Sequence, residues 1–253
     1  MGLQLSPFGV IPKKNSDKWQ LILDLSSPHG SSVSDGIDKD LCSLSYISVD
    51  EIAKQVVKLG KGTKLAKMDI KSAYHLVPVH PQDRLLLGMQ WRHRIFVNKT
   101  LLFGLPKFSQ PLQNLEWVIM QRGVAQVYRY LDDFIMLGDP NSDTCANNLK
   151  LILDVCEELG ITVAMDKCEG PAVCLVFLGI EIDTEAMGMR LPVDKLEKLR
   201  ETLRHWRGCK ACTKCELLSL ISQLGHACKP GRVFLSQMIK LSTVAKKLDH
   251  YIR

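Results

Sequence analysis

The stretch VYRYLDDFIML, residues 127–137, sets two adjacent carboxylates, Asp132 and Asp133, between apolar runs rich in β-forming residues. Such runs are buried in folded proteins, and an unpaired buried charge is costly. The pattern predicts a tight hairpin with the aspartates at its tip, because aspartate tolerates turn dihedrals and both carboxylates can face one side there. Two like charges this close require a counter-charge, which a hard divalent cation supplies.

A third carboxylate, Asp69, ends the strand that TKLAKMDI predicts over residues 63–70. Mg²⁺ favours one or two carboxylates together with substrate phosphates. Three carboxylates at strand ends would complete a clamp of two metal ions for a phosphoryl displacement. Adjacent aspartates taken alone are more typical of a solvated turn, so the rest of the sequence has to decide between the two interpretations.

The composition is that of a globular protein without a membrane segment. The chain has 253 residues, 46 % of them hydrophobic, and it lacks the run of about 18 apolar residues that a transmembrane helix requires. No charged segment precedes an apolar stretch at the N-terminus, so we expect no secretion signal. Nine cysteines in such a chain indicate reduced thiols. We therefore expect an intracellular protein of the cytoplasm or nucleus, neither secreted nor membrane-bound.

Charge is distributed unevenly along the chain. Residues 190–253 carry 14 Lys and Arg against 5 Asp and Glu, whereas residues 1–189 carry 19 against 22. A basic C-terminal segment behind a mildly acidic body predicts contact with a polyanion. The simpler interpretation is a solvated helical face, and charge alone does not separate the two.

Periodicity and capping residues predict a mixed α/β region followed by helices. Strands are predicted within residues 8–25, 63–70, 85–103 (a hairpin turning at Arg92–Arg94), 127–137, 161–165 and 173–183, with a loop over 26–47. Helices are predicted over 51–60 after a Ser48–Glu51 capping box, over 111–121, from Asn141 or Ser142 to Gly160, after an Asp194–Glu197 capping box, and over 213–228. The change of texture predicts a domain boundary near residue 190.

Five stretches, in order along the chain, resemble the motifs of retroelement reverse transcriptases. They are KKNSDKWQLILDL (13–25, the fingers hairpin), DIKSAY (69–74, the first aspartate motif), LLFGLP (101–106, the loop against template and nucleotide), YLDD (130–133, the YxDD box) and FLGIEID (177–183, the primer-grip strands). One such motif arises by chance, whereas five in the family's order do not. Details such as DLSSPHG, LLGMQW and WRGCKAC are most similar to DIRS-like, tyrosine-recombinase retrotransposons.

The resemblance implies an α+β right-hand polymerase fold, with fingers and palm over residues 1–190 and the start of a helical, basic thumb over residues 191–253. It implies an RNA-directed DNA polymerase that uses two Mg²⁺ ions, an RNA/DNA primer–template and deoxynucleoside triphosphates. RNase H, protease and recombinase regions are lacking, and the first fingers strands look missing. We therefore expect a fragment of a longer retrotransposon protein.

The resemblance also implies roles at the reaction centre. Asp69 and Asp132 would hold both metal ions, with help from the backbone carbonyl of Ile70, and Asp133 would lie beside the primer end. Lys167, in AMDKCEG, resembles the lysine that protonates pyrophosphate as a general acid.

The implied nucleotide-binding residues are Lys13, Lys14, Gln20, Tyr74, Phe103 and Gly104, and the implied primer grip is Phe177, Leu178 and Gly179. Tyr74 resembles the steric gate that excludes a ribose 2′-hydroxyl; otherwise it is a core tyrosine. Phe103 and Gly104 would support the template and the nucleotide base. Lys13, Lys14 and Lys18 suit triphosphate contact as point charges, or form a solvated basic turn.

The chain departs from the family in three places. Gln20 stands where the family typically has an arginine, and losing a charge-assisted phosphate contact costs about 1.5–3 kcal/mol. The segment after Leu105, PKFSQPLQNLEW, looks short and places Pro111 where a helix should run, which is harmless only at a helix start. The stretch CKPGRVFL at 228–235 also looks shortened.

The stretch CKACTKC, residues 209–215, superficially resembles a metal site. Three thiols at this spacing would drift around a helix and would need a fourth ligand. Only Cys212 matches related thumbs, in which the positions of Cys209 and Cys215 tend to be basic. Together with the altered loop, these cysteines suggest mutational decay of an element copy.

Three other functions compete with an active reverse transcriptase. The first is a decayed relic that still binds nucleic acid, which Gln20 and the short loop favour and the intact aspartates oppose. The second is an RNA-templated RNA polymerase, which the gate at Tyr74 opposes. The third is a metal-binding regulatory protein built on CKACTKC, which metal analysis would test.

Overall fold

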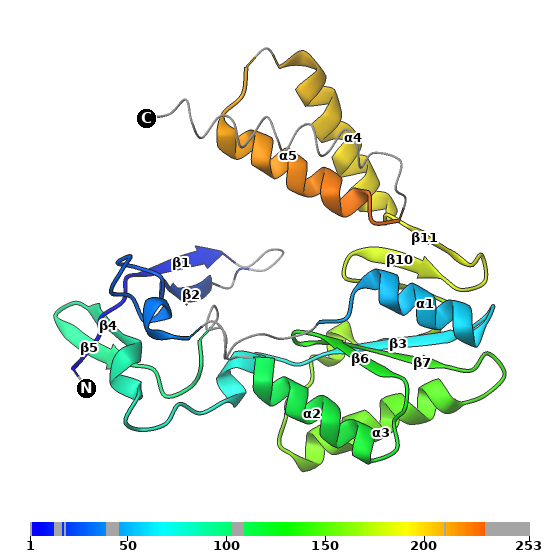
Figure 1. Cartoon of the computed structure of the whole chain (residues 1–253), viewed down its shortest axis with the longest axis horizontal. Helices are drawn as coiled ribbons and strands as arrows, with labels where there is room; N and C mark the ends of the chain where they lie inside the picture. The colour runs from blue at the N-terminus through cyan, green and yellow to red at the C-terminus, as the bar shows by residue number, and fades with distance from the viewer. Residues whose placement is uncertain are drawn as a thin grey trace. The chain divides into compact units, whose positions relative to one another are not determined.

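A computed structural model describes residues 2–12, 17, 19–38, 46–102, 109–209 and 211–230. The strands are β1 (Phe8–Pro12), β2 (Trp19–Leu23), β3 (Lys64–Asp69), β4 (Gly88–Trp91), β5 (Arg94–Val97), β6 (Val127–Tyr130), β7 (Asp133–Gly138), β8 (Glu169–Ala172), β9 (Cys174–Phe177), β10 (Ile180–Asp183) and β11 (Gly188–Arg190). The α-helices are α1 (Val49–Leu59), α2 (Ser109–Gln121), α3 (Thr144–Glu158), α4 (Val193–Gly208) and α5 (Lys214–Ala227). The order along the chain, shown in Figure 1, confirms the predicted change from mixed α/β to helices near residue 190.

The chain divides into two compact units, each built from separate stretches of sequence. Unit 1 comprises Met1–Tyr46, Met68–Phe134 and Asn148–Cys168, and unit 2 comprises Ile47–Lys67, Ile135–Asn147 and Glu169–Arg253. Strands β3 and β7 each contribute residues to both units. These two units are not the predicted fingers–palm and thumb regions. The boundary between those regions near residue 190 stays a prediction.

The hairpin predicted around the two aspartates is present, and it carries the centre of the main sheet. The sheet has the strand order β6-β7-β3-β8, so β6 and β7 are neighbours joined by Leu131 and Asp132. The prediction that aspartate takes the strained turn position was wrong, because the positive φ of +55° belongs to Leu131. Asp133 is already the first residue of β7, so only Asp132 lies in the turn itself.

The run after the aspartates is the most buried strand of the described chain. Phe134, Ile135, Met136 and Leu137 all have 0 % exposure. A strand buried on both faces reads as a continuous apolar run rather than an alternating one. The run FIML therefore fixes β7 inside the sheet and leaves the polar residues at its start.

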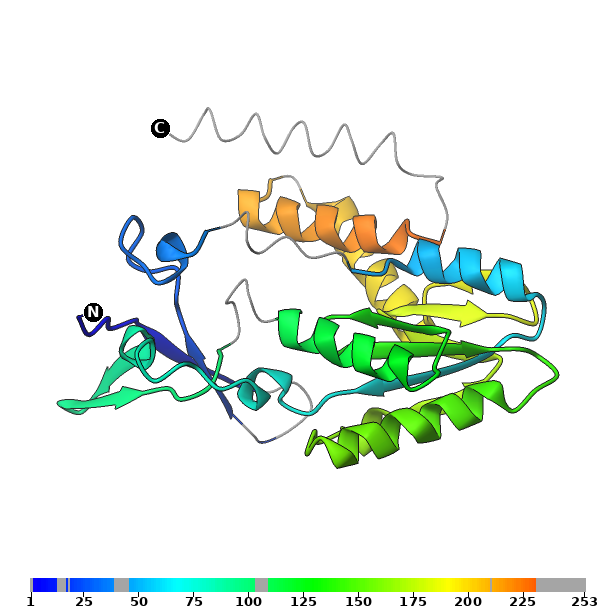
Figure 2. The ribbon, with the colours of Figure 1, turned by 60° about the horizontal axis from the view of Figure 1, so that its bottom comes forward.

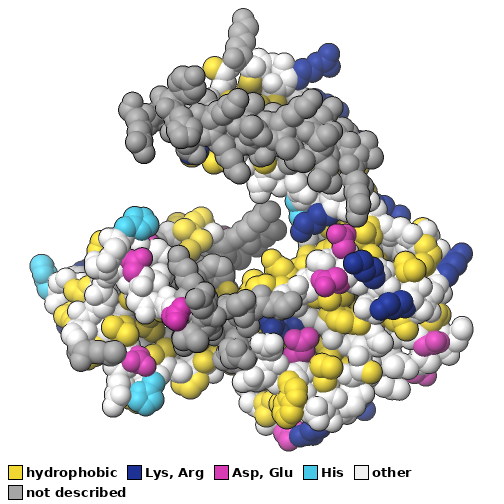
Figure 3. Space-filling model, viewed as in Figure 1, with side chains coloured by type: hydrophobic (Ala, Val, Ile, Leu, Met, Phe, Trp, Pro, Cys, Tyr) yellow, Lys and Arg dark blue, Asp and Glu magenta, His cyan; other side chains and the backbone are white. Residues whose placement is uncertain are grey.

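Two further hairpins lie in unit 1. Strands β1 and β2 pair antiparallel from Phe8↔Leu23 to Pro12↔Trp19, which confirms the two predicted strands; of the turn between them, residues 13–16 and 18 lie outside the described residues. Strands β4 and β5 also pair, and Arg92 and His93 form their turn with positive φ at both positions, as a two-residue hairpin turn requires. A small core of Leu23, Leu25, Val79 and Leu87 underlies these hairpins. Figure 3 shows apolar side chains at the surface over the same region.

The sheet β11-β10-β9 in unit 2 is antiparallel throughout. Residues 173–183, predicted as strand, form the hairpin β9–β10 with a turn at Leu178 and Gly179. The strand predicted over 161–165 was wrong: Val163 makes only an isolated bridge with Ile70. Strands β8 and β11 were not predicted, because each is short and mostly exposed.

Helix boundaries follow the capping chemistry in part. Ser48 and Glu51 form the predicted capping box of α1, and Thr213 with Glu216 forms a second one at α5. The box predicted from Asp194 and Glu197 was wrong, because α4 begins at Val193 behind Pro192, where no side-chain cap is described. Helix α3 begins at Thr144, two residues beyond the later of the two predicted caps.

Helix α2 begins at Ser109, two residues before Pro111, the proline that the sequence places where a helix should run. Pro111 is its third residue, in the first turn, where a missing N–H breaks no helical hydrogen bond. Helices α2 and α3 lie side by side in both ribbon views (Figures 1 and 2), and Arg122 pairs with Glu158 at 3.0 Å between them. Among the described residues, no helix is long and apolar enough to cross a membrane.

Candidate active site

Main-chain hydrogen bonds bring Asp69 and Asp132 together in unit 1. The N–H of Ile70 donates to the carbonyl oxygen of Asp132 at 3.2 Å, and the N–H of Ala164 donates to that of Asp69 at 2.8 Å. A third bond runs from the N–H of Lys71 to the carbonyl of Thr162 at 2.9 Å. The end of β3, the β6–β7 turn and the loop at 162–164 are therefore tied together at the backbone.

Lys167 supplies a cation at this junction. Its Nζ lies 2.6 Å from Oδ2 of Asp69, and the Asp69 side chain is only 13 % exposed whereas that of Lys167 is 60 % exposed. The hydrogen bond to Asp69 raises the pKa of Lys167 above its ordinary value, the charges of Asp69, Asp133 and Asp132 raise it further, and partial burial opposes them. All three predicted carboxylates therefore act electrostatically on one ammonium group.

The charged form of Asp132 is disfavoured by its surroundings. Burial raises the pKa of Asp132 above its ordinary value, and the charge of Asp69 raises it further. A hydrogen bond to its own backbone N–H and the charge of Lys167 act in the opposite direction. A carboxylate desolvated beside a like charge is stabilised by an added cation.

Tyr74 follows Asp69 through a short irregular segment. Ser72 adopts φ +53°, and the 3₁₀ turn Ala73–Leu76 then carries the tyrosine. Burial raises the pKa of Tyr74 to about 12, and the charge of Asp132 and the neighbouring Tyr46 contribute. The phenol is therefore neutral at physiological pH, and the charge of Asp132 acts on its hydroxyl.

A cavity of about 760 Å³ in unit 1 joins these residues. Its described lining includes six residues that the sequence selected, namely Gln20, Asp69, Ile70, Tyr74, Asp132 and Lys167. Lys71, His75 and Asp166 also line it and were not selected. Asp133 is not among the described residues that line the cavity. Its charge nevertheless raises the pKa of Lys167. The volume falls in the range of small-molecule sites.

Arg129 is a residue of the site that the sequence prediction missed. Its side chain is 1 % exposed, its Nε lies 3.2 Å from Oε2 of Glu116 on α2, and its Nη1 donates to the carbonyl of Leu131 at 3.2 Å. A signal existed in VYRYL: an arginine in the middle of an apolar strand must be paired if buried. The pairing fixes the residue that precedes Asp132.

The carboxylate oxygens of Asp69 and Asp132 are of the chemical type that binds a divalent cation. Carboxylate oxygens are the ligands that Mg²⁺ prefers, and the raised pKa of Asp132 beside Asp69 marks a place where positive charge is favourable. As the side chains lie, however, the described residues hold no group of three or more His, Cys, Asp or Glu arranged around one ion. Lys167 takes one oxygen of Asp69, so an ion at that oxygen would replace its contact.

Other selected residues lie elsewhere. Phe177, Leu178 and Gly179 form the β9–β10 turn of unit 2. Lys13, Lys14, Lys18, Phe103 and Gly104, together with the altered loop to residue 108 and the segment from 231, lie outside the described residues.

The three thiols of CKACTKC do not share a helix, and that expectation was wrong. Cys209 is the C-cap of α4, Cys212 lies in the link between the helices, and Cys215 is in the first turn of α5. All three are exposed. Cys209 Sγ lies 3.5 Å from Nε2 of His205. In this stretch the described residues thus bring one thiol close to one histidine, and both residue types can bind metal ions.

A β-hairpin that sets an aspartate beside a second strand-end aspartate, in a cavity with a lysine, is an arrangement suited to metal-assisted phosphoryl transfer, which nucleic-acid polymerases use among other enzymes. The family model described as reverse transcriptase (RNA-dependent DNA polymerase) matches residues 11–182. The chain therefore belongs to the reverse transcriptase family, whose members are RNA-directed DNA polymerases that generally use divalent metal ions.

Solved structures show the same fold. The foamy viral protease–reverse transcriptase in complex with an RNA/DNA hybrid has a TM-score of 0.68 and 15 % identity, over 96 % of this chain and 30 % of that chain. The complex of the foamy viral enzyme with double-stranded DNA, described as dRH, has a TM-score of 0.64 and 16 % identity, over 99 % and 44 %. None of the curated proteins matches the sequence.

These likenesses confirm the predicted α+β polymerase fold. At 15–16 % identity they carry the fold alone. The chain spans between about a third and a half of the length of the structures it matches.

Proposed function

We propose that the chain is the polymerase region of a retrotransposon reverse transcriptase, of the DIRS-like kind that its sequence details resemble. The reaction is attack of a primer 3′-hydroxyl on the α-phosphate of a deoxynucleoside triphosphate, with release of pyrophosphate. The observation that carries the proposal is the meeting of Asp69, Asp132 and Lys167 on a cavity that Tyr74 and Gln20 also line.

Asp69 and Asp132 are the proposed carboxylate ligands of two Mg²⁺ ions, with Asp133 and the carbonyl of Ile70 as further ligands. Magnesium, when bound, would neutralise charge on the attacking and leaving oxygens. The chain's own contribution is position, because the main-chain bonds from Ile70 and Ala164 hold the two aspartates in place before substrate arrives.

Lys167 is the proposed proton donor to pyrophosphate. Its raised pKa keeps it protonated at neutral pH, and its mostly exposed side chain leaves it accessible from the cavity that it lines. In the resting site the same proton-bearing group is paired with Asp69. Binding of cations at Asp69 would release Lys167 toward the phosphates.

Tyr74 is the proposed steric gate against a ribose 2′-hydroxyl, and its neutral phenol presents a ring without charge to the nucleotide. Gln20, on β2, lines the same cavity. Further proposed contacts are Lys13 and Lys14 on the triphosphate and Phe103 and Gly104 under the base. The proposed primer grip is the turn at Phe177, Leu178 and Gly179 in unit 2.

At the scale of the whole chain, we infer fingers and palm over residues 1–190 and the beginning of a basic thumb over 191–253. The proposed partners are an RNA/DNA primer–template and deoxynucleotides, with RNase H and recombinase regions elsewhere in a longer element protein. The proposed site of action is the cell interior, in the cytoplasm or nucleus.

A second function, nucleic-acid binding by a decayed copy, is favoured by one observation. Gln20 lines the cavity where a guanidinium would grip the triphosphate, and a glutamine cannot replace a bidentate cation. This alternative keeps the fold and the duplex-binding surface but loses nucleotide use.

One experiment separates the two functions. Primer extension is measured on a homopolymer RNA template with Mg²⁺ and deoxynucleotides, beside the double variant Asp132→Asn/Asp133→Asn. Extension that disappears in the variant supports the polymerase. Absence of extension in the unmodified chain, with binding of an RNA/DNA duplex retained, contradicts the polymerase and supports the decayed copy.

A further inference from the structure

The tip of the β9–β10 hairpin is joined to two helices through a single backbone atom. The carbonyl oxygen of Gly179 accepts a hydrogen bond from Nζ of Lys195 on α4 at 3.3 Å and lies 3.4 Å from Nε2 of His226 on α5. A carbonyl oxygen can only accept, so His226 contributes the form with a proton on Nε2. All three residues belong to unit 2.

The turn is shaped for this close approach. Leu178 and Gly179 adopt φ +47° and +76° between the paired residues Phe177 and Ile180, which is the geometry of a two-residue hairpin turn. A Cβ added to Gly179 would overlap Nζ of Lys195 and lie 3.1 Å from Nε2 of His226. Glycine is thus required both for its dihedral angle and for the space that the two side chains occupy.

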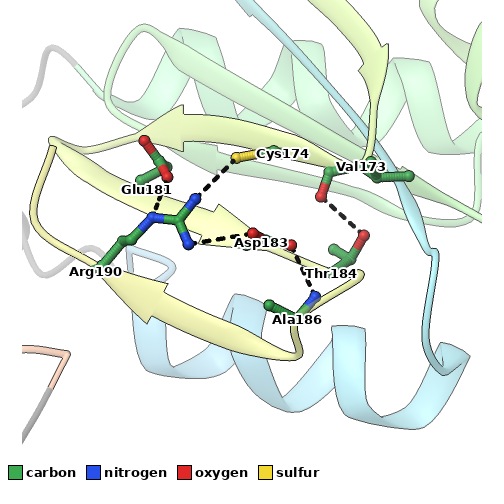
Figure 4. Close-up of polar contacts among 7 residues, drawn as sticks. All are labelled: Val173, Cys174, Glu181, Asp183, Thr184, Ala186 and Arg190. Atoms are coloured by element: carbon green, nitrogen blue, oxygen red, sulfur yellow. Dashed lines mark hydrogen bonds and ion pairs between the residues drawn. The ribbon is translucent and has the colours of Figure 1, made fainter.

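The rest of the hairpin is held by other contacts. Nζ of Lys67 donates to the carbonyl of Val176 at 2.9 Å and pairs with Glu169 at 2.7 Å. On the other edge Arg190 of β11 bridges Glu181 and Asp183 of β10, as Figure 4 shows. These contacts fix the strands, whereas those of Lys195 and His226 fix the tip.

We propose that Lys195 and His226 are positioning residues for the primer end, acting through the Gly179 carbonyl. The inference rests on the proposed function, in which Phe177–Gly179 is the primer grip. With both donors in place, the turn has one orientation relative to α4 and α5. Without them the duplex still binds, but the terminal primer base is held less uniformly.

The test uses a fluorescent 2-aminopurine at the primer 3′ end, bound as an RNA/DNA duplex to the full chain. The variants are Lys195→Met and His226→Phe, each of which removes one donor. His226→Gln retains an N–H donor at similar reach. Lys198→Met, on the same helix, is the control that loses an equal charge away from the turn.

We expect Lys195→Met and His226→Phe to change the 2-aminopurine signal and to lower the single-turnover extension rate about tenfold, the scale of one lost hydrogen bond. His226→Gln should restore both. Lys198→Met should weaken duplex affinity about as much as Lys195→Met does, with an unchanged signal. A 2-aminopurine signal that is the same in all four variants would overturn the inference.

Hydrogen exchange in the protein alone provides a readout that does not depend on polymerase activity. The Ile180 amide, which lies in the residue pair that closes the turn, should exchange faster in Lys195→Met and His226→Phe than in Lys198→Met. Equal exchange in all variants contradicts the role of the two donors even if the chain is an active polymerase. Faster exchange in a chain that extends no primer instead contradicts the proposed function and leaves the tie between the helices and the turn standing.

Discussion

The guanidinium of Arg129 donates a hydrogen bond to the carbonyl oxygen of Leu131, two residues ahead in the chain, while its other side pairs with Glu116. Leu131 is the residue with positive φ that turns the chain into Asp132. A buried cation therefore stabilises the backbone of the turn that carries the proposed metal ligand.

Replacing Arg129 with methionine should destabilise the protein and disorder the turn. The change leaves Glu116 and the Leu131 carbonyl without their partner, at a cost of about 2–3 kcal/mol for a buried polar contact. Urea unfolding measures the loss, and it should be smaller in the double variant Arg129→Met/Glu116→Gln, which removes both charges. Equal stability of Arg129→Met and the unmodified chain would contradict the role.

Replacing Asp132 with asparagine should abolish primer extension, at least about a hundredfold, yet raise thermal stability in the absence of metal. The folded-state pKa of Asp132 is raised, so its charged form destabilises the fold, and this penalty appears as pH rises through the carboxyl range. The gain in melting temperature should be present at neutral pH and should vanish in acid, where Asp132 is already protonated. A gain that is independent of pH would refute this cause.

Replacing Lys167 with methionine should have two opposite effects. Asp69 loses the ammonium at 2.6 Å, so binding of Mn²⁺, followed by its paramagnetic resonance, should become tighter. The extension rate should nevertheless fall, by about 10²-fold for a lost general acid. Weaker Mn²⁺ binding in this variant would show that Lys167 supports the metal site rather than competing with it.

Replacing Gln20 with arginine should improve nucleotide use. Gln20 already lines the cavity, and a restored charge-assisted phosphate contact contributes about 1.5–3 kcal/mol, or roughly ten- to a hundredfold. The gain should appear in KM for the deoxynucleotide and not in duplex affinity. Gln20→Lys, a point charge without the planar fork, should recover less.

Replacing Tyr74 with alanine should let ribonucleotides enter. The ring lies on the cavity beside Asp132, and removal of a steric block changes selectivity by about 10–200-fold. Tyr74→Phe keeps the ring and should retain selectivity, because the proposed block is the ring itself and the hydroxyl that is lost carries no charge. Discrimination against ribonucleotides that is unchanged in Tyr74→Ala would assign the tyrosine to the core.

The sequence predicted the parts of this fold that depend on local chemistry. The Ser48–Glu51 capping box, the polar turn at Arg92–Arg94 between two apolar runs, and the run FIML of β7 are each marked in the local sequence. The box at Asp194 failed because Pro192 fixes an earlier helix start. Strand β8 was not predicted, because its residues EGPA are not typical of a strand. They form one through their pairing with β3, which is distant in the sequence.

Site residues that belong to sequence motifs were predicted, whereas residues that support the site through packing contacts were not. Asp69, Asp132, Lys167 and Tyr74 were selected from the sequence and line one cavity with Gln20. Arg129 was missed, because its partner Glu116 lies 13 residues away on another element. Lys195 and His226 were missed since both act on a backbone atom, which leaves no mark in the sequence of the turn.

The interleaving of the two units limits how this chain can be recombined with its relatives. Each unit takes its residues from three separate stretches, and β3 and β7 belong to both. A crossover at any single point between residues 47 and 168 would join halves of two different proteins within both units. Chimeras should therefore keep the parent's free energy of unfolding only when residues 47–67, 135–147 and 169–253 are exchanged as one set.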